Sequence, residues 1–289
     1  MPTLPEPALV KRIIDGALAE DLAWGDLTTD SLVDPSQTGV GRLVAKEDGV
    51  LAGIEVAALV FTRNDPTLQT EMLVADGSRI APHTTLATVR GRVASILRAE
   101  RVSLNFVQRM SGIATATANY VAATKGTSAR IVDTRKTTPG LRALEKYAIR
   151  VGGAANHRFC LSDGVLIKDN HLAALRARGL GIREAVDLAR AHVPHMVRIE
   201  VEVESQSEAQ EALEAGADVI LLDNMSPEEM RRAVDLIGGR ATTEASGGIT
   251  LATVRAVAES GVDLISVGAI THSVRALDIS LDLEVEAAS

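Results

Sequence analysis

The chain has few aromatic residues, only one cysteine, and fewer basic than acidic residues. Aromatic residues make up 2% of its 289 residues, so it offers little surface on which nucleic-acid bases could stack. Its 30 Lys and Arg against 38 Asp and Glu give a net charge of -8, which argues against a broad phosphate-binding surface. We therefore expect no nucleic-acid partner, and any anion site must be local.

A disulfide framework and a long apolar segment are also missing. Cys160 is the only cysteine, which excludes an intrachain disulfide and a thiolate metal cluster and suits a reducing cytoplasm. The N-terminal stretch lacks the apolar segment of a signal peptide, and the most apolar run, residues 49–61, is too short to span a bilayer. With 46% hydrophobic and 24% charged residues, the chain reads as a cytoplasmic globular protein with no membrane partner.

From about residue 129 onward, short aliphatic runs alternate with amphipathic stretches that end at glycine. This alternation predicts parallel strands joined by helices, as in an α/β barrel, although six strands are clear and not eight. The six runs are ARIVDTRK, GVLIKDN, VRIEVEVES, DVILLDN, RATTEASGG and VDLISVGA. Ser205 with Glu208, and Ser226 with Glu229, fit the capping box of a helix start. We therefore predict an open or incomplete α/β barrel.

The first hundred or so residues are less regular and indicate a separate α+β domain. A long helical segment follows, and we interpret Ser111-Gly112 as a break in that helix and as a domain boundary. The predicted domains are therefore residues 1–112 and 113–272. The elements expected in the first domain are a helix at 7–18 and strands at 41–45, 70–75 and 85–91.

Basic residues gather where the predicted strands end. The carboxyl ends of barrel strands converge on one mouth, so Arg135, Lys136 and Lys168 are expected to share it, with Arg158 on the loop before the Lys168 strand. Such a cluster repels itself unless an anion fills it. Glycines in EASGGI and SVGAITHS follow late strands and let backbone N–H groups approach a phosphate. The pattern predicts a barrel enzyme that handles phosphorylated anions.

Acidic residues and histidines stand beside these cations. Glu202 and Asp223, at two strand ends, could accept hydrogen bonds from sugar hydroxyls, hold Mg²⁺ or stabilise a developing positive charge. Alternatively, they simply form ion pairs with the lysines and arginines. Of the six histidines, His157, His171 and His272 lie beside the clusters. The other three, in presumed loops or helix ends, are expected to be solvated: His83, His192 and His195.

Two other functions stay open at this point. A lysine at a barrel strand end can form a Schiff base, so Lys168 could serve an aldolase-like lyase, although the phosphate-like loops do not favour that chemistry. A non-catalytic member of the fold could bind an anionic metabolite without turning it over.

The order of motifs along nearly the whole chain resembles one family, quinolinate phosphoribosyltransferase, the carboxylating nicotinate-nucleotide pyrophosphorylase of NAD synthesis. One departure is Ala154, which interrupts the run of glycines that the family usually has before Asn156. The matching segments are EDLAWGDLTTD, AERVSLNFVQRMSGIAT, DTRKTTPGLRALEKYAIRVGGAANHR, LIKDNH, EVEVES, ILLDN, EASGGI and VGAITHS.

The resemblance implies a fold, a reaction and partners. The N-terminal domain would be an α/β sandwich on which the C-terminal tail 273–289 packs, and the second domain an open α/β barrel. The enzyme would transfer phosphoribosyl from 5-phosphoribosyl pyrophosphate to quinolinate with decarboxylation, giving nicotinate mononucleotide, pyrophosphate and CO₂. Mg²⁺ would be the cofactor, held through the substrate phosphates with Glu202 and Asp223 as candidate ligands. A homodimer is implied, with Arg101 reaching into the partner's site.

The resemblance also assigns residues to parts of the site. Arg101, Arg135, His157, Arg158 and Lys168 would surround the quinolinate carboxylates. Lys136 would join Lys168 on the pyrophosphate side, and Glu202 and Asp223 would hold the ribose hydroxyls. The residues that would line the 5′-phosphate site are Ser246, Gly247, Gly268 and His272.

Overall fold

The computed structural model describes residues 2–287, and within them the chain forms two compact units, which are described separately. The first unit comprises the described residues of Met1–Ala118, Thr137–Gly153 and Thr271–Ser289. The second comprises Asn119–Lys136 and Ala154–Ile270. These units are defined by contacts and not by independent folding, so the division into residues 1–112 and 113–272 stays a prediction.

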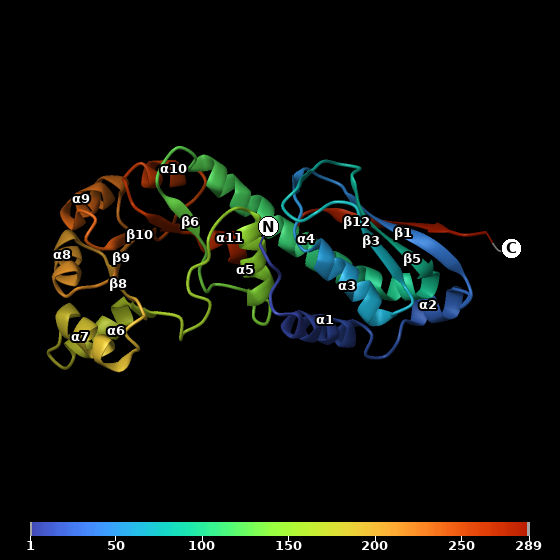
Figure 1. Cartoon of the computed structure of the whole chain (residues 1–289), viewed down its shortest axis with the longest axis horizontal. Helices are drawn as coiled ribbons and strands as arrows, with labels where there is room; N and C mark the ends of the chain where they lie inside the picture. Colours follow the sequence, from blue (N-terminus) through green and yellow to red (C-terminus); the bar gives the residue numbers. More distant parts are fainter. Residues whose placement is uncertain (1, 288–289) are drawn as a thin grey trace. The chain divides into compact units, whose positions relative to one another are not determined.

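The first unit is built on a four-stranded antiparallel sheet with the strand order β12-β1-β5-β3 (Figure 1). Helix α3 packs on β3 and β5, and α1 packs on α3. The predicted helix and three strands of this region are all present, and β12 pairs with β1 along its whole length. The elements are α1 (Pro7–Asp21), α2 (Leu27–Leu32), β1 (Thr38–Ala45), β2 (Gly49–Val50), α3 (Ile54–Asn64), β3 (Gln69–Met72), β4 (Arg79–Ile80), β5 (Thr85–Arg92), α5 (Arg142–Val151) and β12 (Ile279–Val285).

The long helix α4 (Val93–Ala123) shows that the predicted break at Ser111-Gly112 is wrong, because the helix runs through both residues. The Ser111 hydroxyl is buried and donates to the Ala52 carbonyl at 3.1 Å, while the Ala52 N–H donates to it at 3.0 Å. A Cβ at Gly112 would collide with the backbone carbonyl of Arg275. The two small residues therefore permit close packing against the helix and do not interrupt it.

The second unit contains a six-stranded parallel sheet with the order β6-β11-β10-β9-β8-β7. All six predicted strands are present. No pairing joins the two outer strands, β6 and β7, among the described residues, so the predicted open barrel is confirmed. The strands are β6 (Arg130–Val132), β7 (Val165–Ile167), β8 (Ile199–Val203), β9 (Val219–Asp223), β10 (Thr242–Ser246) and β11 (Leu264–Ser266).

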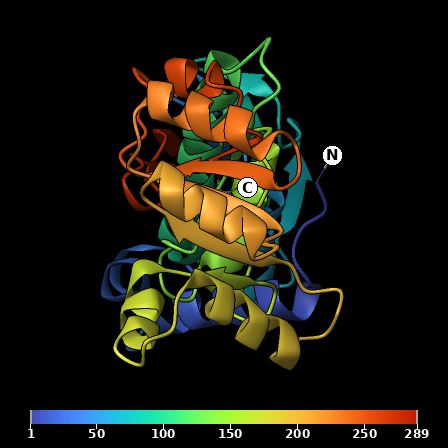
Figure 2. The same ribbon diagram turned by 90° about the vertical axis from the view of Figure 1, so that its left-hand side faces the viewer.

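Helices connect these strands and cover the outside of the sheet. Figure 2 looks onto α8 and α9, drawn in orange in front of the strands, and α8 packs on β8 and β9. Because the strands are covered, β8 and β9 are almost wholly buried, as parallel strands require. The helices are α6 (Asp169–Arg176), α7 (Ile182–His192), α8 (Gln206–Glu214), α9 (Pro227–Ile237) and α10 (Val254–Ala258); α11 (Ala269–His272) follows β11.

Of the two capping boxes predicted at helix starts, one forms completely and the other only in part. At α9, Ser226 and Glu229 form the predicted reciprocal capping box. At α8, the Ser205 hydroxyl accepts from the Glu208 N–H at 3.2 Å, but the Glu208 carboxylate turns back to the N–H of Glu204 instead of Ser205. No helix among the described residues is long and apolar enough to cross a membrane.

Candidate functional site

A cavity of about 280 Å³ lies at the carboxyl ends of the parallel strands in the second unit. Its walls come from the segment after β6, the loop before β7, the residue that follows β7, and the C-terminal halves of β8, β10 and β11. Leu166 and Leu221 add apolar surface. The other lining residues are Thr134, Arg135, Lys136, His157, Arg158, Lys168, Glu202, Glu244, Ser246 and Ser266.

The cavity brings together cations that are far apart in the sequence. Arg135, Arg158 and Lys168 all line it, together with Lys136. Among the lining residues, these four cations face two carboxylates, those of Glu202 and Glu244. The geometry therefore supplies the concentrated positive charge that the strand-end pattern predicts, and it suits a small, highly charged anion.

Not every predicted site residue lines this cavity. Asp223, Gly247 and Gly268 lie in the same unit but outside the lining. Asp223 ends β9 beside Ser246 at the end of β10. Arg101 and His272 belong to the first unit, the former exposed on α4 and the latter at the end of α11. The roles of these five residues stay predictions.

Lys168 and Glu202 face each other across the cavity, with Lys168 Nζ 3.7 Å from Glu202 Oε2. Burial raises the pKa of Glu202, and the nearby Asp223 and Asp169 add to this effect, while Lys168 opposes it. Glu202 therefore does form the ion pair that the simpler interpretation expects. The pair is loose, and the Lys168 side chain is 46% exposed, so an anion can still approach the amine.

The Lys168 backbone sits at the start of α6, where its N–H donates to His171 Nδ1 at 2.9 Å. His171 is thus a helix-capping residue in this structure. The Lys168 amine is half-exposed and lies beside a carboxylate, whereas a Schiff-base lysine is typically desolvated in a hydrophobic pocket or placed beside another cation. An anion at Lys168 would also meet the N-terminal end of α6.

Arg158 is held in the cavity wall by its own loop. Its Nη1 donates to the Gly164 carbonyl at 3.0 Å. Burial and then the neighbouring Arg135 lower the pKa of Arg158, while Glu200 and Asp163 counteract them. The two arginines repel one another, and a bound anion would relieve that repulsion.

The loop after β10 shows why glycine stands at position 247. Gly247 has a φ of +92°, and a Cβ there would collide with the side chain of Asn224. The Asn224 N–H in turn donates to the Ser246 carbonyl at 3.0 Å. The ends of β9 and β10 are therefore locked together at the point where Asp223 and Ser246 lie side by side.

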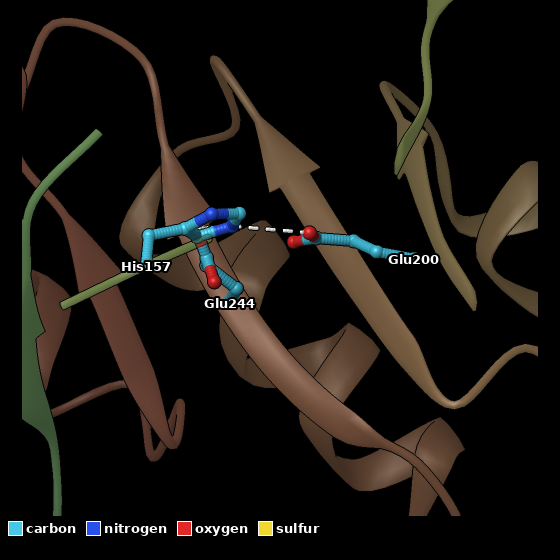
Figure 3. Close-up of side chains that lie close together, drawn as sticks. All are labelled: His157, Glu200 and Glu244. Atoms are coloured by element: carbon cyan, nitrogen blue, oxygen red, sulfur yellow. Dashed lines mark hydrogen bonds and ion pairs between the residues drawn. The ribbon is translucent and has the colours of Figure 1, made fainter. Parts of the chain in front are cut away.

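Sequence reasoning missed a buried acidic cluster in which the carboxylates of Glu200 and Glu244 face the predicted site residue His157 (Figure 3). His157 and Glu244 also line the cavity. His157 Nε2 lies 3.1 Å from Glu200 Oε2 and 3.6 Å from Glu244 Oε1. Burial, and then the Glu200 carboxylate, raise the pKa of Glu244 to about 7. A signal existed: Glu200 precedes Glu202 by two residues on one strand, which places both on the same face.

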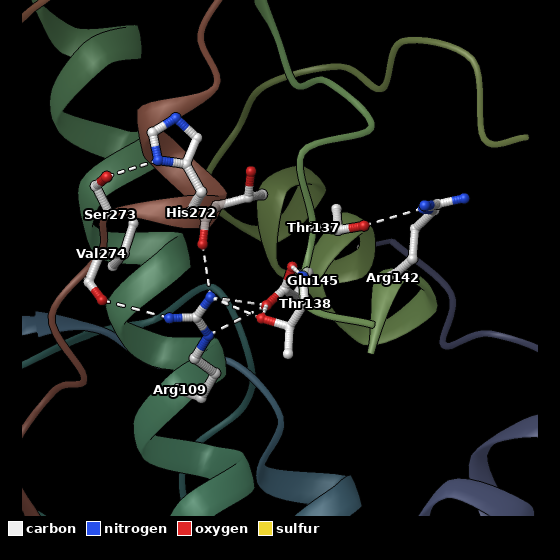
Figure 4. Close-up of polar contacts among 9 residues, drawn as sticks. Arg109, Thr137, Thr138, Arg142, Glu145, His272, Ser273 and Val274 are labelled. Atoms are coloured by element: carbon white, nitrogen blue, oxygen red, sulfur yellow. Dashed lines mark hydrogen bonds and ion pairs between the residues drawn. The ribbon is translucent and has the colours of Figure 1, made fainter. Parts of the chain in front are cut away.

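A second polar network lies in the first unit, around Arg109 of α4 (Figure 4). Arg109 Nη2 donates to Glu145 Oε1 at 2.8 Å and to the Thr271 carbonyl at 2.6 Å. Arg109 Nη1 donates to the Val274 carbonyl at 3.4 Å. The residues on either side of His272 are thereby tied to α4 and α5.

The fold and the cavity together define a class: an open α/β-barrel protein that binds small anions at the carboxyl ends of its strands. Comparison with protein families narrows this class. Residues 26–111 match the family model described as quinolinate phosphoribosyl transferase, N-terminal domain, and residues 113–282 match the C-terminal domain of the same family. The chain belongs to the quinolinate phosphoribosyltransferase family.

Individual relatives agree with this assignment. The chain is 44% identical to a probable nicotinate-nucleotide pyrophosphorylase [carboxylating] of Bacillus subtilis, over 95% of this chain and 93% of the relative. It is 45% identical to the nicotinate-nucleotide pyrophosphorylase [carboxylating] of Mycobacterium leprae, over 92% and 94%. The crystal structure of NadC from Streptococcus pyogenes superimposes with a TM-score of 0.93 at 42% identity, covering 99% of this chain and 100% of that one.

Proposed function

We propose that the protein is a carboxylating nicotinate-nucleotide pyrophosphorylase. It transfers phosphoribosyl from 5-phosphoribosyl pyrophosphate to quinolinate and releases pyrophosphate and CO₂, giving nicotinate mononucleotide for NAD biosynthesis. The observation that carries the proposal is the single cavity lined by Arg135, Arg158 and Lys168. Two anionic substrates require such a concentration of donors, and relatives that align over nearly the whole chain bear the same enzyme name.

Quinolinate binding follows from the two kinds of surface in the cavity. Arg135 and Arg158 offer planar guanidinium groups that pair with carboxylates in a bidentate manner. Leu166 and Leu221 offer apolar surface to the flat pyridine ring. The ring is thereby oriented so that its nitrogen points to the second substrate, and holding two reactants in place replaces a bimolecular encounter.

The transfer step develops charge at two points. The ring nitrogen attacks the anomeric carbon as pyrophosphate departs, and the sugar passes through an oxocarbenium-like state. Lys136 and Lys168 absorb the negative charge of the leaving pyrophosphate, while Glu202 and Asp223 hold the ribose hydroxyls and face the developing positive charge. The ring is then a cationic pyridinium, which accepts the electrons left when the adjacent carboxylate leaves as CO₂.

Mg²⁺ completes the proposal as a partner of the pyrophosphate. The Glu202 carboxylate is half-buried, and the nearby charge of Asp223 contributes to the rise of its pKa. Carboxylate oxygens are the ligands that Mg²⁺ prefers. These residues fit the ion directly or through water. When bound, the ion would neutralise pyrophosphate charge in the ground state and as the bond breaks.

A cytoplasmic homodimer is also part of the proposal. The first unit exposes Trp24, Leu27 and Leu32 by 96%, 82% and 78%, and such large apolar side chains are typical of an interface. Helix α2, which carries Leu27 and Leu32, pairs through Asp30 with Arg98, one turn before Arg101 on α4. This face is therefore suited to present Arg101 to a partner subunit.

One assay tests the central claim. The purified protein is supplied with 5-phosphoribosyl pyrophosphate, Mg²⁺ and either quinolinate or nicotinate, and mononucleotide, pyrophosphate and CO₂ are followed. We expect equal amounts of the three products from quinolinate. Tight quinolinate binding without pyrophosphate release would contradict the enzymatic claim, and faster turnover of nicotinate would contradict the specificity claim.

A further inference from the structure

The loop that carries Arg158 is fastened to three buried carboxylates, each from a different strand or strand end. Asp133, which follows β6, accepts hydrogen bonds from the His157 N–H and from the Asn156 side chain, both at 2.8 Å. Glu200 of β8 and Glu244 of β10 face the His157 ring (Figure 3). The loop is thus anchored on groups to which neither the sequence pattern nor the resemblance assigns a function.

Both nitrogens of the His157 ring are used inside the protein. Nδ1 accepts the backbone N–H of Arg158 at 2.7 Å, so the ring proton must sit on Nε2. Nε2 then donates to Glu200 Oε2 at 3.1 Å. The ring therefore links the carboxylates to the backbone of Arg158, and these two hydrogen bonds fix its orientation.

The buried carboxylates of this cluster lower the stability of the folded protein, so stability alone does not explain why they are there. Glu200 is 6% exposed and Glu244 is 1% exposed. Among the described residues, Glu200 Oε1 and Glu244 Oε1 accept no hydrogen bond. Burying two carboxylates beside one imidazole costs free energy that an apolar pair of the same size would not. Stability alone does not explain such a feature, and two of its residues, His157 and Glu244, line a cationic cavity.

We propose that Glu200 and Glu244 are positioning residues for quinolinate binding: they fix the His157 ring, which fixes the Arg158 backbone and so places the Arg158 guanidinium in the cavity wall. The inference rests on the proposed function. It adds to the part that the resemblance implies for His157, because the ring also orients Arg158. Glu200 also supports the charge of Arg158 directly.

The test compares variants at Glu244, since this almost fully buried residue of the cavity wall faces the His157 ring. Glu244→Ala removes the contact with the ring, whereas Glu244→Gln keeps the shape and an acceptor oxygen. Thr243→Val is the matched control: Thr243 is the preceding residue of β10, it is 3% exposed, and its side chain points to the other face of the strand.

We expect Glu244→Ala to raise the KM for quinolinate by about tenfold or more, with the KM for phosphoribosyl pyrophosphate changed less than about twofold. Glu244→Gln should restore the quinolinate KM to within about threefold of the wild type, and Thr243→Val should leave it unchanged. A folded Glu244→Ala protein with a normal quinolinate KM would overturn the inference, as would equal losses in Glu244→Ala and Thr243→Val. Wild-type protein without turnover would instead contradict the proposed function.

If Glu244→Ala does not fold, a measurement on the wild-type protein tests the inference instead. The ¹⁵N spectrum of His157, identified by its loss in His157→Gln, reports the ring tautomer. A fixed Nε2–H tautomer supports the inference, and an imidazolium or a mixture of tautomers overturns it.

Discussion

The two buried polar networks of this molecule are both built around glutamate carboxylates but balance their charges differently. In the first unit, Glu145 is 1% exposed and both its oxygens are used. Oε1 receives Arg109 Nη2 and the Thr138 hydroxyl, both at 2.8 Å, and Oε2 receives the Thr138 N–H at 3.0 Å (Figure 4). In the second unit, two carboxylates share one imidazole, and an oxygen of each accepts no hydrogen bond within the described residues.

The difference separates a structural network from a functional one. A carboxylate paired with a guanidinium and hydrogen-bonded at both oxygens joins segments of chain at little net cost. Two buried carboxylates beside a single imidazole lower stability, and such an arrangement is typical of a functional site. Breaking the Arg109 network should therefore lower stability, and altering the residues around the cavity should lower activity.

The largest expected effect is on activity. Arg158→Ala and Lys168→Ala each remove a cation from the substrate cavity, and losing one member of such a contact typically costs about 2–5 kcal/mol. We expect kcat/KM to fall by roughly tenfold to a thousandfold or more, with the melting temperature little changed. Steady-state kinetics and thermal unfolding check this, and near-normal turnover in both variants would remove these residues from the site.

Arg109→Ala should produce the reverse pattern, a loss of stability. It leaves Glu145 buried without its counter-ion, which typically costs about 3–5 kcal/mol of unfolding free energy. Denaturant unfolding measures the change. Arg63→Ala is the matched control, because Arg63 donates from Nε and Nη2 to the two oxygens of Asp15 on the surface, where a pair is worth about 0–1 kcal/mol. Equal losses in both variants would break the comparison.

The pH dependence of stability should have opposite signs at two buried acids. Burial and Glu200 raise the pKa of Glu244, so the folded state binds its proton more tightly, and stability falls as pH rises from the ordinary Glu range to about 7. Glu244→Gln should therefore be stabilising by roughly 1–3 kcal/mol more at about pH 8 than at about pH 5, measured by urea unfolding.

Asp65 of the first unit gives the contrasting case. Burial would raise its pKa, but hydrogen bonds from Ser95, Thr67 and Arg92 outweigh burial and lower it. A carboxyl group with a lowered pKa stabilises the folded protein. The contribution of Asp65 is fully present above the ordinary Asp pKa of about 3.9 and is lost as pH falls below it. The difference in stability between Asp65→Asn and wild type should stay constant from about pH 8 to about pH 5 and shrink only in acid. A slope of the same sign as at Glu244 would contradict this reasoning.

The smallest expected effect is a loss of stability in the network around Glu145, where Thr138→Val can be compared with Arg109→Ala. Thr138→Val keeps the size of the side chain but removes one hydrogen bond to Glu145 and one contact to Arg109. We expect a loss of about 1 kcal/mol in unfolding free energy, because the ion pair itself remains. Denaturant unfolding alongside Arg109→Ala measures it, and a loss as large as that of Arg109→Ala would show that Thr138 carries the network.

The parallel sheet and most of the cationic cavity could be predicted from the sequence because both depend on local patterns. Aliphatic runs ending in charged residues identify strand ends, and the geometry of parallel strands brings Arg135, Lys136 and Lys168 together. The Ser111-Gly112 prediction failed for a non-local reason. The same small residues can end a helix or admit a crossing backbone, and only the distant segment at Arg275 decides between the two.

The acidic cluster could not be predicted because the role of each glutamate depends on how deeply its side chain is buried. Glu200, Glu202 and Glu204 alternate in the sequence and look equivalent there, yet Glu200 is buried in β8, Glu202 lines the cavity and Glu204 is exposed just after the strand ends. The strand register from β8 through β9 to β10 places Glu244 level with Glu202, two residues beyond Glu200, and the sequence does not specify that register.

The pairing of β12 with β1 has a practical consequence for handling the protein. Strand β1 lies between β12 and β5, so a chain shortened before Ile279 would turn β1 into a sheet edge with a row of exposed backbone donors and acceptors. Shortened versions should consequently self-associate. Affinity tags are better joined through a spacer beyond residue 287 than substituted for the last strand.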